Sequence, residues 1–80
     1  MTKNYYNQML DAIKADNGLA DKQEFSIVTA ESGALVSDKQ YRFNGYNLEY
    51  YNDVKATWVV SNTYRQGLFT GDWIIRKGAI

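Results

Sequence analysis

Apolar residues close to the N-terminus recur at the spacing of one face of a helix. With successive residues placed 100° apart, the apolar ones occupy an arc of about 160°, and polar side chains fill the other side. The residues in this arc are Tyr5, Tyr6, Met9, Leu10, Ala12 and Ile13. Thr2 can cap the start of such a helix, and Gly18 can end it by adopting a left-handed conformation. The pattern predicts an amphipathic helix over residues 3–16 that packs on a sheet through one face.

Beyond this helix, apolar and polar residues alternate in short runs separated by Asn, Asp and Gly, which is typical of strands. We expect strands over residues 25–30, 40–44, 46–51, 54–61, 68–70 and 73–77. The β-branched residues between 54 and 61 favour a strand there. A partly helical conformation of residues 46–58 is the alternative, because another set of residues recurs at helix-like spacing: Leu48, Tyr51, Val54, Lys55 and Trp58.

Asn44 and Gly45 indicate a β-hairpin, because both residue types tolerate the positive φ angles of a type I′ turn. A two-residue turn at these positions predicts that Phe43 pairs with Tyr46, and it makes Arg42 a diagonal neighbour of Glu49. One face of the hairpin then carries Tyr41, Phe43, Tyr46, Leu48 and Tyr50, and the other carries Gln40, Arg42, Asn47, Glu49 and Tyr51. We therefore expect one buried face and one polar face.

These elements predict a single α+β domain spanning residues 1–80, in which an N-terminal amphipathic helix packs on a four- to five-stranded antiparallel β-meander. A chain of 80 residues buries only about 60–65% of the surface that its unfolded form exposes. No cysteine is present, so no disulfide supplements this small core. Formation of a homodimer is one way to gain further burial.

The N-terminal segment lacks the apolar stretch of a signal peptide, and no apolar run approaches the roughly 20 residues that a membrane-spanning helix needs. Small secreted domains are usually rich in disulfides, whereas this chain has no cysteine. We therefore expect a cytoplasmic protein, in a bacterial or phage-infected cell, with no membrane partner.

Histidine and cysteine are both absent from the chain. It therefore has no imidazole base near neutral pH, no Ser-His-Asp or Cys-His nucleophile system, and no zinc site of nitrogen or sulfur ligands. Its glycines do not fall at the spacing of a phosphate-binding loop. We expect no enzymatic activity, no catalytic residues, no cofactor and no metal site.

Aromatic residues are the most informative part of the composition, with seven Tyr, three Phe and two Trp. A single helix cannot cover all of these rings on a sheet, so several are expected to face solvent. Tyr and Arg are over-represented among the residues that dominate binding energy at protein interfaces. We expect a partner-binding surface that includes Tyr5, Arg42, Glu49, Tyr51, Tyr64 and Arg65.

This combination predicts a non-enzymatic protein-interaction module, and more specifically a stoichiometric inhibitor or regulator of a larger protein complex. In its length, its Tyr and Asn content and its lack of catalytic chemistry, the chain resembles in general style the small proteins of bacteriophages and mobile elements. Many of those proteins, anti-CRISPR proteins among them, block a host complex. The resemblance lies in these general properties and not in a motif.

Two alternatives follow from other features of the chain. Residues 11–53 include eight acidic and four basic residues, whereas residues 55–80 include four basic and one acidic. The basic residues of the second segment, which lie among aromatic ones, could hold a single-stranded nucleic acid: Lys55, Arg65, Arg76 and Lys77. A formal net charge of zero argues against this alternative. The other alternative is a small structural or assembly subunit that self-associates.

Overall fold

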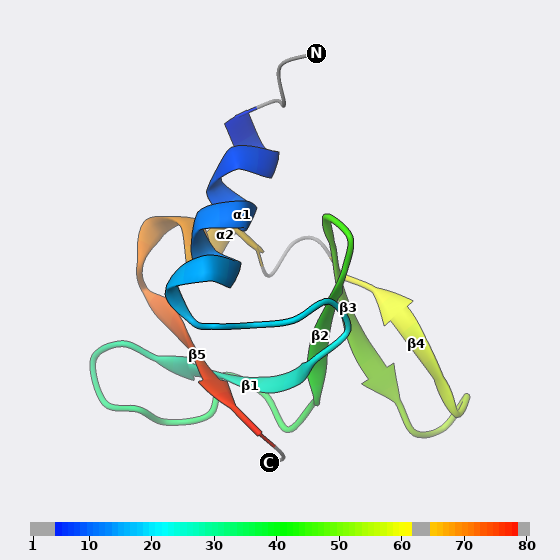
Figure 1. Ribbon diagram of the computed structural model, residues 1–80. Helices are drawn as coiled ribbons and strands as arrows, with labels where there is room; N and C mark the ends of the chain where they lie inside the picture. Colours follow the sequence, from blue (N-terminus) through cyan, green and yellow to red (C-terminus); the bar gives the residue numbers. More distant parts are fainter. Residues whose placement is uncertain (1–4, 62–64, 79–80) are drawn as a thin grey trace.

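Five antiparallel strands form one sheet with two helices against it, in a computed structural model that describes residues 5–61 and 65–78 (Figure 1). The elements are α1 (Tyr5–Asp16), β1 (Glu24–Thr29), β2 (Tyr41–Asn44), β3 (Asn47–Asn52), β4 (Thr57–Val60), α2 (Arg65–Thr70) and β5 (Trp73–Lys77). The strand order is β4-β3-β2-β1-β5. The first four strands therefore form a meander, and β5 returns to the far side of β1. The predicted α+β class, with an N-terminal helix on an antiparallel sheet, is confirmed.

The core lies between the helices and one face of the sheet, which we call the inner face. Strand alternation places its central side chains on this face, where they are almost completely buried: Phe25, Ile27, Tyr41, Phe43 and Leu48. Leu10 of α1 and Leu68 of α2 belong to the same cluster. Both helices therefore cover the inner face, and the opposite face, called the outer face below, receives no helix from the described residues.

Helix α1 covers the inner face through only part of its apolar side. Leu10 is fully buried and Ile13 packs against the core, whereas Tyr5 and Tyr6 are exposed at the end that projects beyond the sheet (Figure 1). Lys14 connects the helix to the β2–β3 turn, because its Nζ donates to the carbonyl oxygen of Gly45 at 2.8 Å. No helix in the described part of the chain is long and apolar enough to cross a membrane.

The register of the β2–β3 hairpin differs from the prediction. Asn44 pairs with Asn47, and the turn residues are Gly45 and Tyr46, not Asn44 and Gly45. Gly45 has a φ of 62°, whereas Asn44 and Tyr46 have no positive φ, which matches a type II′ turn with glycine at its first central position. Because the pairing shifts by two positions, the same side chains still share each face of the hairpin, as predicted. It also places Arg42 directly opposite Glu49, where the prediction had made them diagonal neighbours.

The strand predicted over residues 54–61 is shorter, because residues 53–56 form the turn between β3 and β4. The side chain of Asn52 accepts a hydrogen bond from the backbone N–H of Lys55 at 3.1 Å, which stabilises this turn. Ala56 closes it with a φ of 54°, and Val54 is 97% exposed. The β-branched character of Val54 was therefore a misleading signal. The partly helical alternative is also wrong, since the segment is strand, turn and strand.

Residues 68–70 do not form the predicted strand beside β5 but the end of the short helix α2. Two side chains of α2 pack inward, with Leu68 buried in the core and Phe69 against it. Gly67 allows the helix to approach Trp73 closely, because a Cβ at this position would overlap the indole ring. The partner of β5 is β1, with Ile27 opposite Ile75. A tertiary contact, and not local strand propensity, determines the conformation of this segment.

Candidate functional site

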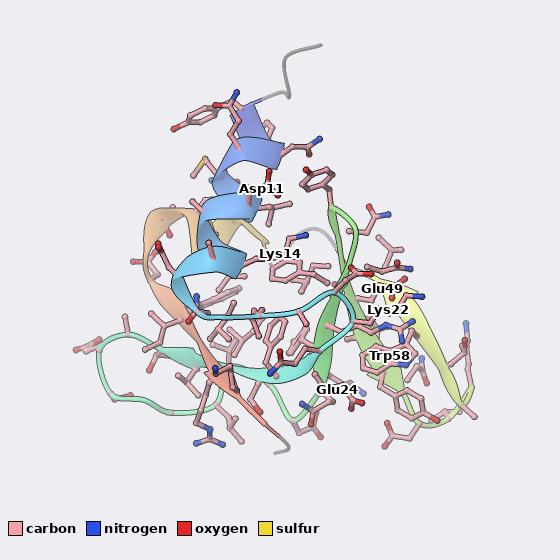
Figure 2. The ribbon with its side chains drawn as sticks, viewed as in Figure 1. Asp11, Lys14, Lys22, Glu24, Glu49 and Trp58 are labelled. Atoms are coloured by element: carbon pink, nitrogen blue, oxygen red, sulfur yellow. The ribbon has the colours of Figure 1, made fainter. Side chains whose placement is uncertain are left out.

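Four side chains gather on the outer face where β2, β3 and β4 lie next to one another. These residues, Arg42, Glu49, Tyr51 and Trp58, are called the outer-face cluster below. Glu49 pairs with Arg42 on one side, and Tyr51 pairs with Trp58 on the other. Because side chains alternate along each strand, this register places all of them on the face opposite the core. Figure 2 shows Glu49 and Trp58 over neighbouring strands.

Arg42 is held by two different interactions. Its Nε donates to Oε1 of Glu49 at 2.8 Å, and its guanidinium carbon lies 4.2 Å from the centroid of the Trp58 ring. The second distance is well inside the range of a cation–π contact. The side chain of Arg42 is 22% exposed and that of Glu49 is 11% exposed, so this ion pair is shielded from water on most sides. Its geometry is therefore fixed more firmly than that of a pair in open solvent.

Glu49 is a carboxylate in an almost buried position, and both of its oxygens have partners. Oε1 accepts from Arg42, and Oε2 accepts from Nδ2 of Asn44 at 3.4 Å. Burial of a charge is tolerated when the charge is paired and hydrogen-bonded. The terminal Nη groups of Arg42 have no hydrogen bond to any described residue. The ion pair is neutral as a unit, and the Nη groups of Arg42 retain their capacity to donate hydrogen bonds.

Tyr51 and Trp58 form the aromatic part of the cluster. Their ring centroids are 5.4 Å apart with an interplanar angle of 69°, which is an edge-to-face arrangement. Both residues are half-buried, so each ring keeps a solvent-facing side. Val60, two residues after Trp58 on the same face, is 52% exposed. The cluster therefore presents an ordered aromatic and aliphatic surface around a neutralised ion pair.

The structure brings together three of the six predicted partner-binding residues, namely Arg42, Glu49 and Tyr51. Tyr5 is 70% exposed, as expected, but it lies on α1, which covers the inner face. Tyr64 lies outside the described residues, and Arg65 begins α2 with a side chain that is also outside them. Trp58 was missed as a site residue. The sequence indicates that Trp58 and Val60 share a face of their strand. It does not indicate that Trp58 contacts Arg42, because β3 lies between the strands of these two residues.

A separate hollow of about 310 Å³ opens beside the end of the hairpin, lined by Lys39, Tyr41, Tyr50 and Ser61. Lys39 Nζ lies 5.7 Å from the centroid of the Tyr50 ring, and the hydroxyl of Tyr41 is hydrogen-bonded to that of Ser37 at 2.9 Å. None of these described lining residues is a carboxylate. Among the described residues, no three carboxylates gather where they could hold a metal ion.

Exposed rings are also found at the projecting end of α1. The Tyr6 ring lies 6.3 Å from Tyr5 and 5.6 Å from Phe69 of α2, measured between centroids. These rings belong to the helical side of the molecule, so they do not form a continuous surface with the outer-face cluster.

No family model matches the chain, and neither the curated proteins nor the solved structures with which it was compared include a match.

Proposed function

We propose that the protein is a non-enzymatic protein-binding module and that the outer-face cluster is its recognition surface. The observation that carries this proposal is the position of Arg42, which is ion-paired with Glu49 and stacked on Trp58 at 4.2 Å in the isolated chain. Trp, Tyr and Arg are the residue types most enriched among interface hot spots. Side chains that are ordered before binding lose less conformational entropy on association.

The chemistry of the cluster suggests what a partner would present to it. The ion pair is neutral as a unit, so long-range electrostatic attraction contributes little, and affinity comes from burial of the aromatic rings and Val60. The Nη groups of Arg42 need acceptors when a partner displaces water from them, such as a backbone carbonyl or a carboxylate. A protein surface with an apolar depression bordered by acceptors meets both needs.

Stoichiometric inhibition is the mode of action that we propose for this module. A small domain without histidine or cysteine can act on a larger complex by covering a surface, as the anti-defence proteins of phages do, and anti-CRISPR proteins are one example. The absence of cysteine also supports a cytoplasmic site of action.

Binding of single-stranded nucleic acid is less well supported by the positions of the charges. That function needs stacking rings beside cations that contact phosphates. Arg76 and Lys77 lie on β5, where the ring of Trp73 packs against the core and Gly67 of α2. Trp58 lies on β4, at the opposite edge of the sheet. Of the described basic residues from the C-terminal segment, only Lys55 lies in the turn next to β4.

The proposal is tested by affinity capture from the native host, followed by titration of the purified partner by calorimetry. Trp58→Ala and Arg42→Ala are each expected to weaken binding at least about 30-fold, as hot-spot residues do. Ile74→Ala is the matched control, since Ile74 is exposed on the outer face but on β5. Circular dichroism verifies that each variant is folded. Equal affinities of all variants, or salt-sensitive binding to oligonucleotides in place of a protein, would contradict the proposal.

A further inference from the structure

Strand β4 forms one edge of the sheet, and the direction of its backbone groups follows from the ladder. The N–H of Ser61 donates to the carbonyl oxygen of Leu48 at 2.8 Å, which continues the pairing of β4 with β3. In an antiparallel pair, residues that exchange hydrogen bonds alternate with residues that do not. Thr57 and Val59 therefore direct their N–H and C=O groups toward β3. Trp58 and Val60 direct theirs away from the sheet, where the described part of the chain supplies no partner.

The two edges of the sheet differ in how they resist pairing with another strand. Strand β5 ends in Arg76 and Lys77, and α2 packs against it. Charged residues and a covering element are the usual protections of an edge strand. Strand β4 has the sequence Thr-Trp-Val-Val, with no charge and no proline. Its β-branched and aromatic side chains favour pairing, so β4 is the less protected of the two edges.

We infer that β4 pairs antiparallel with β4 of a second copy of this chain, about a two-fold axis at Val59. This register places Trp58 opposite Val60 of the second copy, and Val60 opposite its Trp58. Both residues direct their backbone groups outward, so each free N–H meets a free C=O across the axis. Shifting the register by two residues would instead pair Trp58 with its own equivalent, and Val60 with Ala56, which lies in the turn with a positive φ. The register centred on Val59 gives the outward backbone groups of both Trp58 and Val60 a partner within the strand.

The side chains fit the same register. Trp58 and Val60 of opposite copies meet on the outer face as aromatic and β-branched neighbours, a favourable cross-strand combination. Val59 meets its equivalent on the inner face, where the two residues form a closely spaced pair without mutual hydrogen bonds. No like charges face each other across the axis. The contact is therefore self-complementary in both backbone and side chains, which is the requirement for a two-fold interface.

This dimer extends the fold into one continuous sheet and brings two outer-face clusters onto a single surface. The inference goes beyond the proposed function and does not depend on it. Because the strand is short, the interface is small, and the dimer is expected to form reversibly.

Sedimentation equilibrium tests the dimer. The weight-average mass of the wild-type chain should rise from that of a monomer toward that of a dimer between about 5 µM and about 500 µM, the range for a small reversible interface. Val60→Pro removes an N–H that points away from β3, so the intramolecular ladder is retained while the dimer is lost. Val60→Thr keeps the N–H and should still associate. A wild-type chain that stays monomeric at the highest concentration would overturn the inference.

Cysteine cross-linking tests the register, and the chain contains no cysteine to interfere. Val59→Cys should give a disulfide-linked dimer on mild oxidation, because the two equivalent positions face each other within disulfide distance. Val60→Cys is the matched control on the same strand, where the equivalent positions are offset from each other along the strands. Ile74→Cys is the exposed control on the other edge. Cross-linking through either control but not through Val59→Cys would overturn the proposed pairing.

Discussion

The guanidinium of Arg42, on β2, reaches across β3 to lie 4.2 Å from the centroid of the Trp58 ring on β4. Glu49 lies on the strand between them and accepts a hydrogen bond from the same guanidinium at 2.8 Å. Three neighbouring strands are thus joined through one side chain. Each link depends on the observed register of the hairpin, since a shift in the β2–β3 pairing would move Arg42 away from Glu49.

Arg42→Lys tests the contribution of stacking separately from that of charge. Lysine retains the positive charge but lacks the planar group that packs on an indole ring, so the free energy of unfolding should fall by about 1 kcal/mol. Urea denaturation followed by circular dichroism measures the change. Arg76→Lys, at an exposed position on β5, should leave the value unchanged within about 0.5 kcal/mol. An equal effect of both substitutions would show that stacking on Trp58 contributes no stability.

Gly67→Ala tests whether helix propensity or packing against Trp73 has the larger effect on stability. Alanine is a better helix former than glycine by about 1 kcal/mol, so propensity alone would make α2 more stable. The added Cβ, however, would overlap the indole ring of Trp73. We expect the overlap to dominate and to lower the free energy of unfolding by about 2 kcal/mol. The same urea titration measures the change, and Gln66→Ala, at an exposed position of the same helix, is the control. A more stable Gly67→Ala protein would mean that α2 can move away from β5 at little cost.

Lys14→Met tests the attachment of α1 to the β2–β3 turn. The substitution keeps an unbranched side chain but removes the hydrogen bond to Gly45 and the cation 5.0 Å from the centroid of the Tyr46 ring. We expect a loss of about 0.5–1 kcal/mol, because both interactions are partly solvated. Thermal unfolding measures the loss, and Lys55→Met in the exposed β3–β4 turn serves as the comparison. Identical melting temperatures for the two variants would contradict a role for Lys14 in holding the helix.

Ser26→Ala should be neutral or stabilising by up to about 1 kcal/mol. The Oγ of Ser26 is fully buried and has no hydrogen-bond partner among the described residues. A buried hydroxyl without a partner loses its hydration, whereas alanine fills nearly the same space without that cost. A melting temperature lower than that of the wild type would show that the hydroxyl has a partner in solution.

Local patterns predicted most of the fold. The apolar arc predicted helix α1, and the alternating runs predicted the strands at residues 25–30 and 73–77. The register of the hairpin was wrong because Asn44-Gly45 and Gly45-Tyr46 are both acceptable two-residue turns. Both turns place the same side chains on the same face of the hairpin, so the error did not change which residues are buried.

The remaining differences arise from contacts between residues that are distant in sequence. Helix α2 has only six residues and contains Gly67, so its local preference for a helix is weak, and the contact with Trp73 determines its conformation. The outer-face cluster could be predicted only in part. Arg42, Glu49 and Tyr51 were identified from residue type and face, whereas Trp58 required knowledge that β4 lies beside β3.

The helices cover the sheet unevenly, and this affects which strands unfold locally and which positions tolerate substitution. The helices cover the part formed by β1, β2, β5 and the start of β3, and the rest of the β3–β4 hairpin extends away from them (Figure 1). At concentrations where the chain is monomeric, amide hydrogens of β1 should therefore exchange with solvent most slowly, and those of Trp58 and Val60 much more quickly. Side chains at the rapidly exchanging end can be replaced during evolution without disturbing the cluster around Phe25 and Tyr41, so one stable scaffold can acquire new specificities through a single hairpin.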